Sequence, residues 1–339
     1  MSKGIDELIE ISHYAAKDIA YIQGGGGNTS VKITDTQMAV KASGCKLSDM
    51  AELEGYVVVD YKKIRDHFNA ADCDAEDFEA TSSQALQASM IEVEGLKILR
   101  PSVEAGFHSL LKKHVIHTHS VYANILCCCK EGKDIASKLF ANHSYLWLPY
   151  VNPGAVLTSV VAKAIQNHGS VPEIIFMENH GLIVTADGSK EAIALHEMVN
   201  NAIRVELGLT GDFPEVSVRA IDNTRVASDS AYVKDFFSQT GQSLEMIREL
   251  VLYPDQLVYL NNSIYKKDKS PSDLVLEGNQ LTYKISEKQA KVNEETLVAY
   301  LYVIQSIEEK GLTLVSMSLE QQAFILGWES EAYRKSMLK

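Results

Sequence analysis

Apolar and polar residues in the first hundred positions follow spacings that predict one long helix and then short strands. Residues 5–22 carry isoleucine and leucine at helical spacing, which predicts an amphipathic helix. The alternating segment 30–33 and the segments 37–44 and 55–61 predict three strands. Helical spacing returns at 83–91, where acidic residues interrupt it. We therefore expect a helix, three strands and a second helix in this part of the chain.

The next hundred positions mix helical and strand patterns around several histidines. We expect a helix at 103–113, a strand at 114–119 and a further helix directly after it. Residues 173–188 predict a two-stranded hairpin that turns near Asn179-His180-Gly181, and a helix follows at 189–208. His117 and His119 thus lie on a predicted strand, and His180 lies in a predicted strand turn.

The pattern changes after Gly211, where a proline and a polar stretch replace the regular apolar spacing. Beyond this point we expect an isolated strand at 255–260, a hairpin at 273–285 that turns at Gly278-Asn279, and two helices at 294–310 and 318–337. We therefore place a domain boundary near residue 212. Residues 1–212 are expected to form the main domain, and residues 213–339 a small α+β extension that acts as a lid or an oligomer contact.

The stretch "HVIHTHS" places two histidines one residue apart on a predicted strand. Side chains of a strand alternate between its faces, so His117 and His119 point the same way. Neutral imidazole is a common ligand of divalent metals, which makes a metal site one reading of the pair. Two histidines that only form hydrogen bonds are the other reading, and the pair alone leaves both open.

Composition and charge narrow the class of protein. The chain of 339 residues is 46% hydrophobic and 23% charged, which is typical of a globular protein, and its formal net charge is −13. A strongly acidic chain is a poor partner for nucleic acid, because phosphate binding needs a basic surface. No apolar run is long enough to span a membrane, and the first residues lack a secretory pattern. We therefore expect a cytoplasmic protein.

The five cysteines predict no disulfide framework and no thiolate metal site. Three of them are consecutive, at positions 127–129, and no CxxC pair occurs. Small apolar side chains of this kind are expected to pack beside the "HTHS" segment.

Three further features add chemistry to the histidine pair. With His180, three imidazoles would leave an open position on a tetrahedral zinc ion, as catalytic sites do. Glu104 in "PSVE" supplies a carboxylate at a predicted helix start, where it could move a proton. Together these groups suit a reaction through an enediolate, whose charge a metal could hold.

The glycine run Gly24–Gly27 precedes Asn28 and a predicted strand. Its backbone N–H groups could hold a phosphate, although the run has no GK[ST] and does not open a helix. Four glycines can equally form a turn without a ligand, so both interpretations stay open here.

Taken together, these motifs resemble the class II aldolase/adducin family. "GGGGNTS", "KASG", "PSVE", "HTHS" and "NHGLIV" occur in the family's order between Asp6 and Leu207. The segments "LPYVNPG" and "LGWESEAYR" look most like the aldolase half of bifunctional rhamnulose-1-phosphate aldolase/dehydrogenase proteins.

The resemblance implies a three-layer α/β/α fold around a mainly antiparallel sheet and a homo-oligomer, most often a tetramer, with sites between subunits. His117, His119 and His180 match the family's zinc ligands, and Glu104 matches its catalytic acid/base. From its place before the Pro-Gly turn of "LPYVNPG", we read Tyr150 as a catalytic residue on the substrate side, with simple packing as the alternative. The positions that match or adjoin the family's phosphate site are Gly26, Gly27, Asn28, Thr29, Ser43, Gly44 and Ser102. The family commonly has a second serine where this chain has Val103, so a different anionic substrate remains open.

We therefore expect a zinc-dependent lyase of the class II aldolase type, with one ion per chain and another divalent metal possible. It would cleave or form a C–C bond in a sugar phosphate or a related ketose through a metal-stabilised enediolate. A 4-epimerase, dehydratase or decarboxylase of the same family is the alternative. A non-catalytic, adducin-like binding protein is a further alternative, because folds can lose their chemistry.

Overall fold

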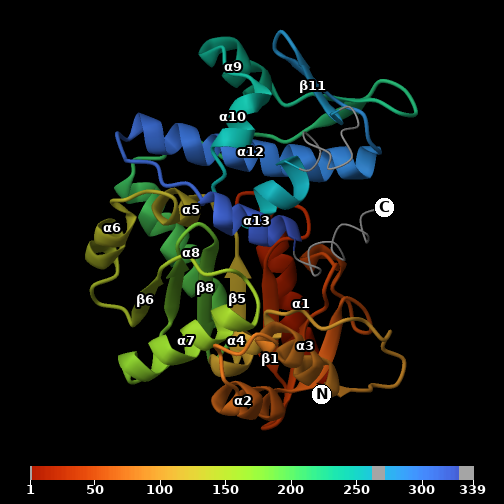
Figure 1. Ribbon diagram of the computed structural model, residues 1–339, viewed down its shortest axis with the longest axis vertical. Helices are drawn as coiled ribbons and strands as arrows, with labels where there is room; N and C mark the ends of the chain where they lie inside the picture. The colour runs from red at the N-terminus through yellow and green to blue at the C-terminus, as the bar shows by residue number, and fades with distance from the viewer. Residues whose placement is uncertain (1, 262–271, 328–339) are drawn as a thin grey trace.

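The structure is a computed structural model that describes residues 2–261 and 272–327. Two sheets organise these residues, a large one in the first two thirds of the chain and a small one near its end. Figure 1 shows the large sheet with its helices in the lower part of the view and the small sheet in the upper part. We call residues 213–327 the C-terminal segment and the residues before it the large-sheet region.

The large sheet has eight strands in the order β4-β3-β2-β1-β5-β8-β7-β6. All neighbouring pairs are antiparallel except β6 and β7, which are parallel. The strands are β1 (Asn28–Lys32), β2 (Gln37–Lys41), β3 (Tyr56–Asp60), β4 (Met90–Ile91), β5 (His114–Thr118), β6 (Tyr145–Leu148), β7 (Ile174–Met177) and β8 (Gly181–Ala186). The predicted hairpin around His180 is confirmed as β7 and β8, and the histidine pair begins on central strand β5.

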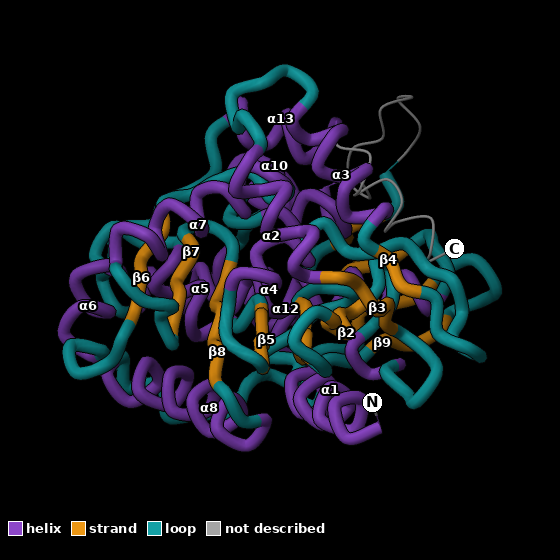
Figure 2. The backbone as a smooth tube through the Cα atoms, turned by 90° about the horizontal axis from the view of Figure 1, so that it is seen from below, coloured by secondary structure: helices purple, strands orange, loops and turns teal. Residues whose placement is uncertain are grey.

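Helices cover both faces of this sheet, because its strands alternate apolar side chains between two cores. Ile116 of β5 packs in one core with apolar residues of the first group of helices, whereas Val115 packs in another core with residues of the second group. The first group is α1 (Ser2–Ala16), α5 (Val121–Cys127), α6 (Gly132–Leu139) and α8 (Ser189–Glu206), and the second is α2 (Tyr61–Ala70), α3 (Phe78–Ala88), α4 (Ala105–Leu110) and α7 (Ala155–His168). Figure 2 shows α1 and α8 below the strands and α2 and α7 above them. The expected three-layer fold around a mainly antiparallel sheet is confirmed.

The C-terminal segment combines a small antiparallel sheet with helices. Its strands are β9 (Val218–Ala220), β10 (Val226–Ser228), β11 (Leu274–Glu277) and β12 (Gln280–Tyr283), and its helices are α9 (Ala231–Thr240), α10 (Leu244–Glu249), α12 (Glu287–Glu309) and α13 (Leu319–Gly327). The predicted hairpin turning at Gly278-Asn279 is confirmed by β11 and β12. From Trp328 onward, the predicted last helix and most of "LGWESEAYR" lie outside the described residues.

The predicted strand at 255–260 is wrong. Residues Gln256–Asn261 form a π-helical turn in which every side chain is buried. A short apolar run buried on all sides has no polar face, so its spacing cannot separate a strand from a helix. The Gln256 side chain stabilises the turn, accepting a hydrogen bond from Leu252 N at 2.8 Å and donating one to Ile247 O at 2.7 Å.

The C-terminal segment shares a hydrophobic core with the large-sheet region. Leu297, Tyr300, Leu301 and Ile304 of α12 are at most 1% exposed and belong to the same core as α1, α5 and α8. Burying a large apolar side chain contributes about 1.5–3 kcal/mol, so this contact binds the segment firmly to the rest of the chain. Figure 1 shows α12 lying across the end of the large-sheet region.

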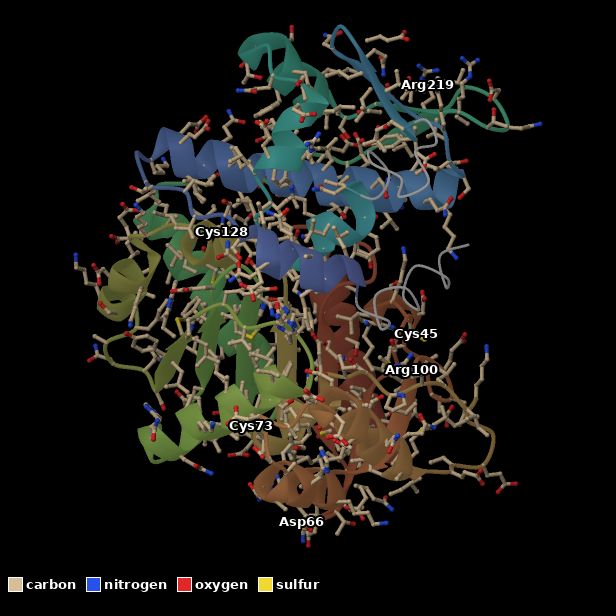
Figure 3. All side chains as sticks on the ribbon, viewed as in Figure 1. Cys45, Asp66, Cys73, Arg100, Cys128 and Arg219 are labelled. Atoms are coloured by element: carbon tan, nitrogen blue, oxygen red, sulfur yellow. The ribbon has the colours of Figure 1, made fainter. Side chains whose placement is uncertain are left out.

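The cysteine triplet lies at this junction, where its side chains are buried as predicted. The carbonyl of Cys128 accepts a hydrogen bond from Val315 N at 2.8 Å, and Figure 3 places Cys128 between the large sheet and α12. No described helix has both the length and the hydropathy needed to cross a bilayer.

Candidate metal centre and active site

Three histidines from neighbouring strands meet at one end of the large sheet. His117 lies on β5, His119 lies just after this strand, and His180 lies in the turn between β7 and β8. Because β8 pairs with β5, the turn brings His180 beside the other two. The ring centroids are 5.0 to 5.4 Å apart, and one nitrogen from each ring lies within 4.8 Å of the others. The structure therefore brings the three predicted ligands together.

Hydrogen bonds orient two of these rings toward the common centre. His117 Nδ1 donates to Leu182 O at 3.0 Å, and His119 Nδ1 donates to Asp255 Oδ2 at 2.6 Å. The Nε2 atoms of both rings are buried and have no hydrogen-bond partner among the described residues, as is also true of His180 Nδ1.

Buried polar atoms normally have a hydrogen-bond partner, so three buried nitrogens without one indicate a site for a ligand. Three imidazoles beside a carboxylate form a donor set that zinc and similar divalent ions accept. The residues present therefore fit the divalent ion that the motifs imply.

Glu104 lies beside this centre at the start of α4. Its Oε1 atom is 3.4 Å from His117 Nε2, longer than a strong hydrogen bond. Burial would raise the pKa of Glu104, but the neighbouring His117 imidazole holds that pKa well below its usual range. We therefore treat Glu104 as an ionised carboxylate, the form that can accept a proton.

The His180 imidazole favours its neutral form. Burial, together with the neighbouring His117 and His119 rings, lowers the pKa of His180 well below its usual value. Neutral imidazole is the form that binds a metal.

The turn that carries His180 is fastened by the C-terminal segment. Asn179 has a positive φ of 49°, a conformation that asparagine tolerates better than most residues. Its side-chain nitrogen donates to Leu252 O and to Val315 O, each at 2.9 Å. The position of His180 thus depends on carbonyl groups far away in the sequence.

The glycine run packs directly against the histidine centre. Gly24–Gly27 are buried, and a Cβ atom on Gly26 would lie 2.6 Å from Asp255 Oδ2 and 2.8 Å from His119 Nδ1. A side chain is therefore excluded at this position by close approach. Gly24 N donates to Glu295 Oε2 at 2.8 Å, so this amide already has a carboxylate partner within the protein.

Asn28, which follows the glycine run, lies opposite His117 in the pairing of β1 with β5. It is only 1% exposed, and neither polar atom of its side chain has a partner among the described residues. Thr29 lies on the opposite face of the strand, where its hydroxyl is 2.7 Å from Ser12 Oγ of α1. The structure therefore brings Asn28 to the centre but does not bring the Thr29 side chain there.

The two predicted serines come from separate loops that the structure places side by side. A bridge between Ala42 and Pro101 joins these loops, and Ser43 N donates to Arg100 O at 2.9 Å. Ser102 Oγ accepts a hydrogen bond from Glu104 N at 3.3 Å, which places it beside the proposed acid/base. Gly44 follows Ser43 with a φ of 81°, which suits the turn after β2.

Tyr150 packs against an apolar cluster of the C-terminal segment that includes Tyr259 and Val292. The Tyr150 hydroxyl is buried and has no hydrogen-bond partner among the described residues. Burial also raises the pKa of this phenol, so it stays protonated at neutral pH and is able to donate a hydrogen bond.

Three charged residues near the centre were not identified from the sequence. Lys41 is 4% exposed and its Nζ atom donates to Gly25 O at 3.2 Å, while Asp255 and Glu295 contact His119 and Gly24. A lysine within the apolar strand of "QMAVKASG" was a signal that could have found Lys41. The two acids had no such signal, because each lies far in sequence from its partner.

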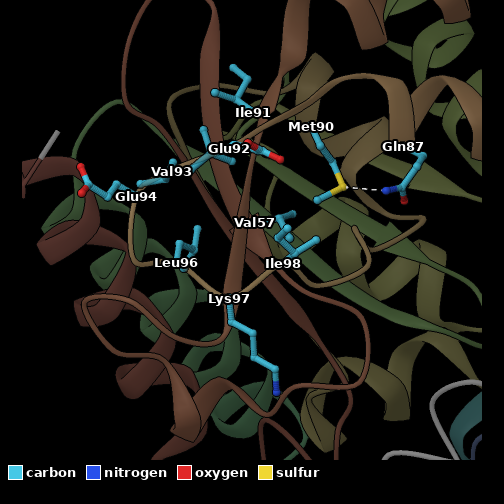
Figure 4. Close-up of a pocket in the computed structure, with 11 residues that line it drawn as sticks. Val57, Gln87, Met90, Ile91, Glu92, Val93, Glu94, Leu96, Lys97 and Ile98 are labelled. Atoms are coloured by element: carbon cyan, nitrogen blue, oxygen red, sulfur yellow. Dashed lines mark hydrogen bonds between the residues drawn. The ribbon is translucent and has the colours of Figure 1, made fainter.

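A separate cleft lies at the β4 edge of the large sheet. Its volume is about 570 Å³, and its lining includes Met90, Ile91, Leu96 and Ile98 beside Glu92 and Lys97. Figure 4 shows these side chains around the cleft. None of the predicted site residues lines it, so the histidine centre remains the candidate active site.

Comparisons with known proteins identify the family of this chain. The family model of the class II aldolase and adducin N-terminal domain matches residues 6–207. The uncharacterized oxidoreductase YuxG of Bacillus subtilis (strain 168) is 32% identical over 201 residues, which are 56% of this chain and 27% of that protein. The chain thus aligns with about a quarter of that relative's length.

Two further relatives match most of their own length. The 3-oxo-tetronate 4-phosphate decarboxylase of Haemophilus influenzae is 22% identical over 221 residues, covering 61% of this chain and 86% of that protein. The N-terminal class II aldolase domain of a conserved protein from Thermoplasma acidophilum has the same fold, with a TM-score of 0.51 and 24% identity over 60% of this chain and 93% of that one. The family match covers more than half of the residues, and the chain therefore belongs to the class II aldolase and adducin family.

Proposed function

We propose that this chain is a zinc-dependent lyase that cleaves or forms a C–C bond in a ketose that carries an anionic group. The observation that carries the proposal is the meeting of three buried histidines with Glu104, whose Oε1 atom is 3.4 Å from His117 Nε2. The family includes class II aldolases, and one relative is named a decarboxylase, which supports C–C bond chemistry.

His117, His119 and His180 would hold the divalent ion. When bound, such an ion supplies Lewis-acid stabilisation of negative charge on a substrate oxygen. The sheet and the Asp255 and Leu182 hydrogen bonds keep the imidazoles in place, so little rearrangement is needed for binding.

Glu104 would move the proton. In the cleavage direction, a base takes the proton of the hydroxyl group on the carbon that becomes the aldehyde. The electrons of the broken C–C bond then pass to the neighbouring carbon, which later receives a proton. An ionised carboxylate beside the metal ligands can accept and return this proton. The protonated Tyr150 hydroxyl would donate a hydrogen bond on the substrate side, and its lack of a partner among the described residues supports this role.

An anionic group of the substrate would bind near Asn28, Ser43, Gly44 and Ser102. Gly26 and Gly27 would contribute only close backbone approach. The unpartnered Asn28 side chain and the buried Lys41 support this placement. We favour a sugar phosphate, and the likeness to the aldolase half of rhamnulose-1-phosphate aldolase/dehydrogenase proteins is the finer part of the proposal.

Decarboxylation is the second candidate. Val103 removes one hydroxyl from the expected phosphate site, and one relative that matches 61% of the chain is named a decarboxylase. A 4-epimerase or dehydratase would use the same groups. The protein is further proposed to act as a cytoplasmic homo-oligomer, with a tetramer favoured.

The test begins with the metal. Purified protein should contain about one divalent ion per chain, and the variant with His117 and His119 both replaced by alanine should contain none. A screen of phosphorylated and acidic ketoses with product analysis then separates aldol cleavage from decarboxylation and epimerisation. Full metal content in the double variant would refute the centre. A metal-loaded protein that converts no compound of the screen would refute the proposed activity.

A further inference from the structure

We propose that Asp255, in the C-terminal segment, is the positioning residue for His119 as a metal ligand. The inference rests on the proposed metal centre and adds to it a residue outside the matched family region of 6–207. The large-sheet region alone would then lack part of its own metal site.

The contact between the two side chains is short and buried. Asp255 Oδ2 lies 2.6 Å from His119 Nδ1, and the two residues are 1% and 6% exposed. A carboxylate only accepts hydrogen bonds, so Nδ1 carries the proton and Nε2 keeps its lone pair for the metal. Metal-binding histidines commonly donate their other N–H to such a group, which fixes the ring and makes it more basic.

The backbone around Asp255 is itself fixed. Gln256, the next residue, is fully buried, and its side-chain nitrogen donates to Ile247 O at 2.7 Å and Leu250 O at 3.0 Å. On the other side, Gly26 approaches so closely that a Cβ atom would overlap both members of the pair. The carboxylate is therefore held against His119 from two directions.

His119 needs this support more than His117 does. His117 lies within β5, and its Nδ1 donates to Leu182 O of neighbouring strand β8. His119 lies beyond the last residue of β5, where the pairing with β8 has ended. A side chain from another part of the fold has to orient the ring at that position.

The test is the metal affinity of Asp255→Asn, an isosteric change that removes the carboxylate. Zinc and cobalt affinities of the full-length protein are measured by competition with a chromophoric chelator. We expect the dissociation constant to rise about 10- to 100-fold, the usual effect of losing such a partner. The visible spectrum of bound Co²⁺ should also change, because the ligand geometry loosens.

Asp229→Asn is the matched control. Asp229 also lies in the C-terminal segment but pairs with the partly exposed Lys234 at 2.9 Å, away from the centre. This variant should keep the wild-type affinity. The melting temperature in EDTA should be the same for wild type and Asp255→Asn, which separates positioning from a general loss of folding.

A dissociation constant of Asp255→Asn within twofold of wild type would overturn the inference. If the variant fails to fold, nitrogen NMR of histidine-labelled, zinc-loaded wild type decides the matter. Metal on His119 Nε2 with a protonated Nδ1 supports the inference, and metal on Nδ1 refutes it. A wild type that binds no metal refutes the proposed function itself. If Asp255→Asn shows the expected loss of metal affinity but the wild type has no turnover, only the proposed reaction is refuted.

Discussion

The large-sheet region and the C-terminal segment contribute different things to the candidate site. The first supplies groups that can touch a metal or substrate, namely the three histidines, Glu104 and Asn28. The second supplies groups that hold these in place, since Asp255 contacts His119 and Glu295 accepts from Gly24. The proposed chemistry of the site therefore resides in the large-sheet region, and part of its positioning comes from the C-terminal segment.

Removal of the C-terminal segment should have the largest effect. A chain cut after residue 212 would expose the core face that α12 covers with four or more large apolar side chains, each worth about 1.5–3 kcal/mol. It would also lose the hydrogen bonds to His119 and Asn179. We expect loss of soluble protein or of activity, checked by light scattering, metal analysis and turnover. A monomeric truncated chain with full activity would contradict both the comparison and the proposed oligomer.

Glu104→Gln tests whether the large-sheet region supplies the group that moves the proton. The change keeps the shape of the side chain but removes its ability to accept a proton, so turnover should fall about 10²- to 10⁴-fold. The metal content should stay near the wild-type value, because the histidines remain. Glu173→Gln, which alters a glutamate paired with Lys112 on the surface, is the control and should keep full turnover. Wild-type turnover in Glu104→Gln would mean that another group moves the proton.

Asn179→Gly tests the hydrogen bonds that join the His180 turn to the C-terminal segment. Glycine keeps the positive φ of the turn but loses both side-chain hydrogen bonds to Leu252 and Val315. Two such bonds contribute about 1–3 kcal/mol together, so urea unfolding should show a loss of that size. Metal affinity, measured by chelator competition, should fall with it because the His180 turn is released. An unchanged affinity would show that β7 and β8 alone position His180.

Asn28→Ala should have the smallest effect and act within the large-sheet region. If Asn28 holds a remote anionic group, KM should rise about 3- to 10-fold with little change in kcat, since such a contact contributes uniform binding. Thr29→Val, on the opposite face of the same strand, is the matched control and should leave KM unchanged. Steady-state kinetics on the preferred substrate checks both variants. A silent Asn28→Ala would indicate that the glycine run is only a closely packed turn.

The sequence by itself determined the elements that carry the histidines. Residues 114–119 and 173–188 are short runs rich in β-branched residues, the second with a turn near Asn179-His180-Gly181, which favours strands. The alternation of side chains in a strand then put His117 and His119 on one side. These signals are local, because strand geometry repeats every two residues. The limits of local signals show in the first helix, which ends at Ala16 rather than at residue 22 so that the chain can turn into the glycine run.

The tertiary structure alone decided how the site is supported. The buried run 255–260 had no polar face to reveal its π-helical turn, and Thr29 proved to face α1 because β1 alternates its side chains. The contact between His119 and Asp255 joins residues 136 positions apart, and that between Gly24 and Glu295 joins residues 271 apart. No periodicity links such positions, since their meeting depends on how α12 and the preceding turn pack against the large-sheet region. Ligands were therefore readable from local pattern, whereas their partners were set by the packing of the whole chain.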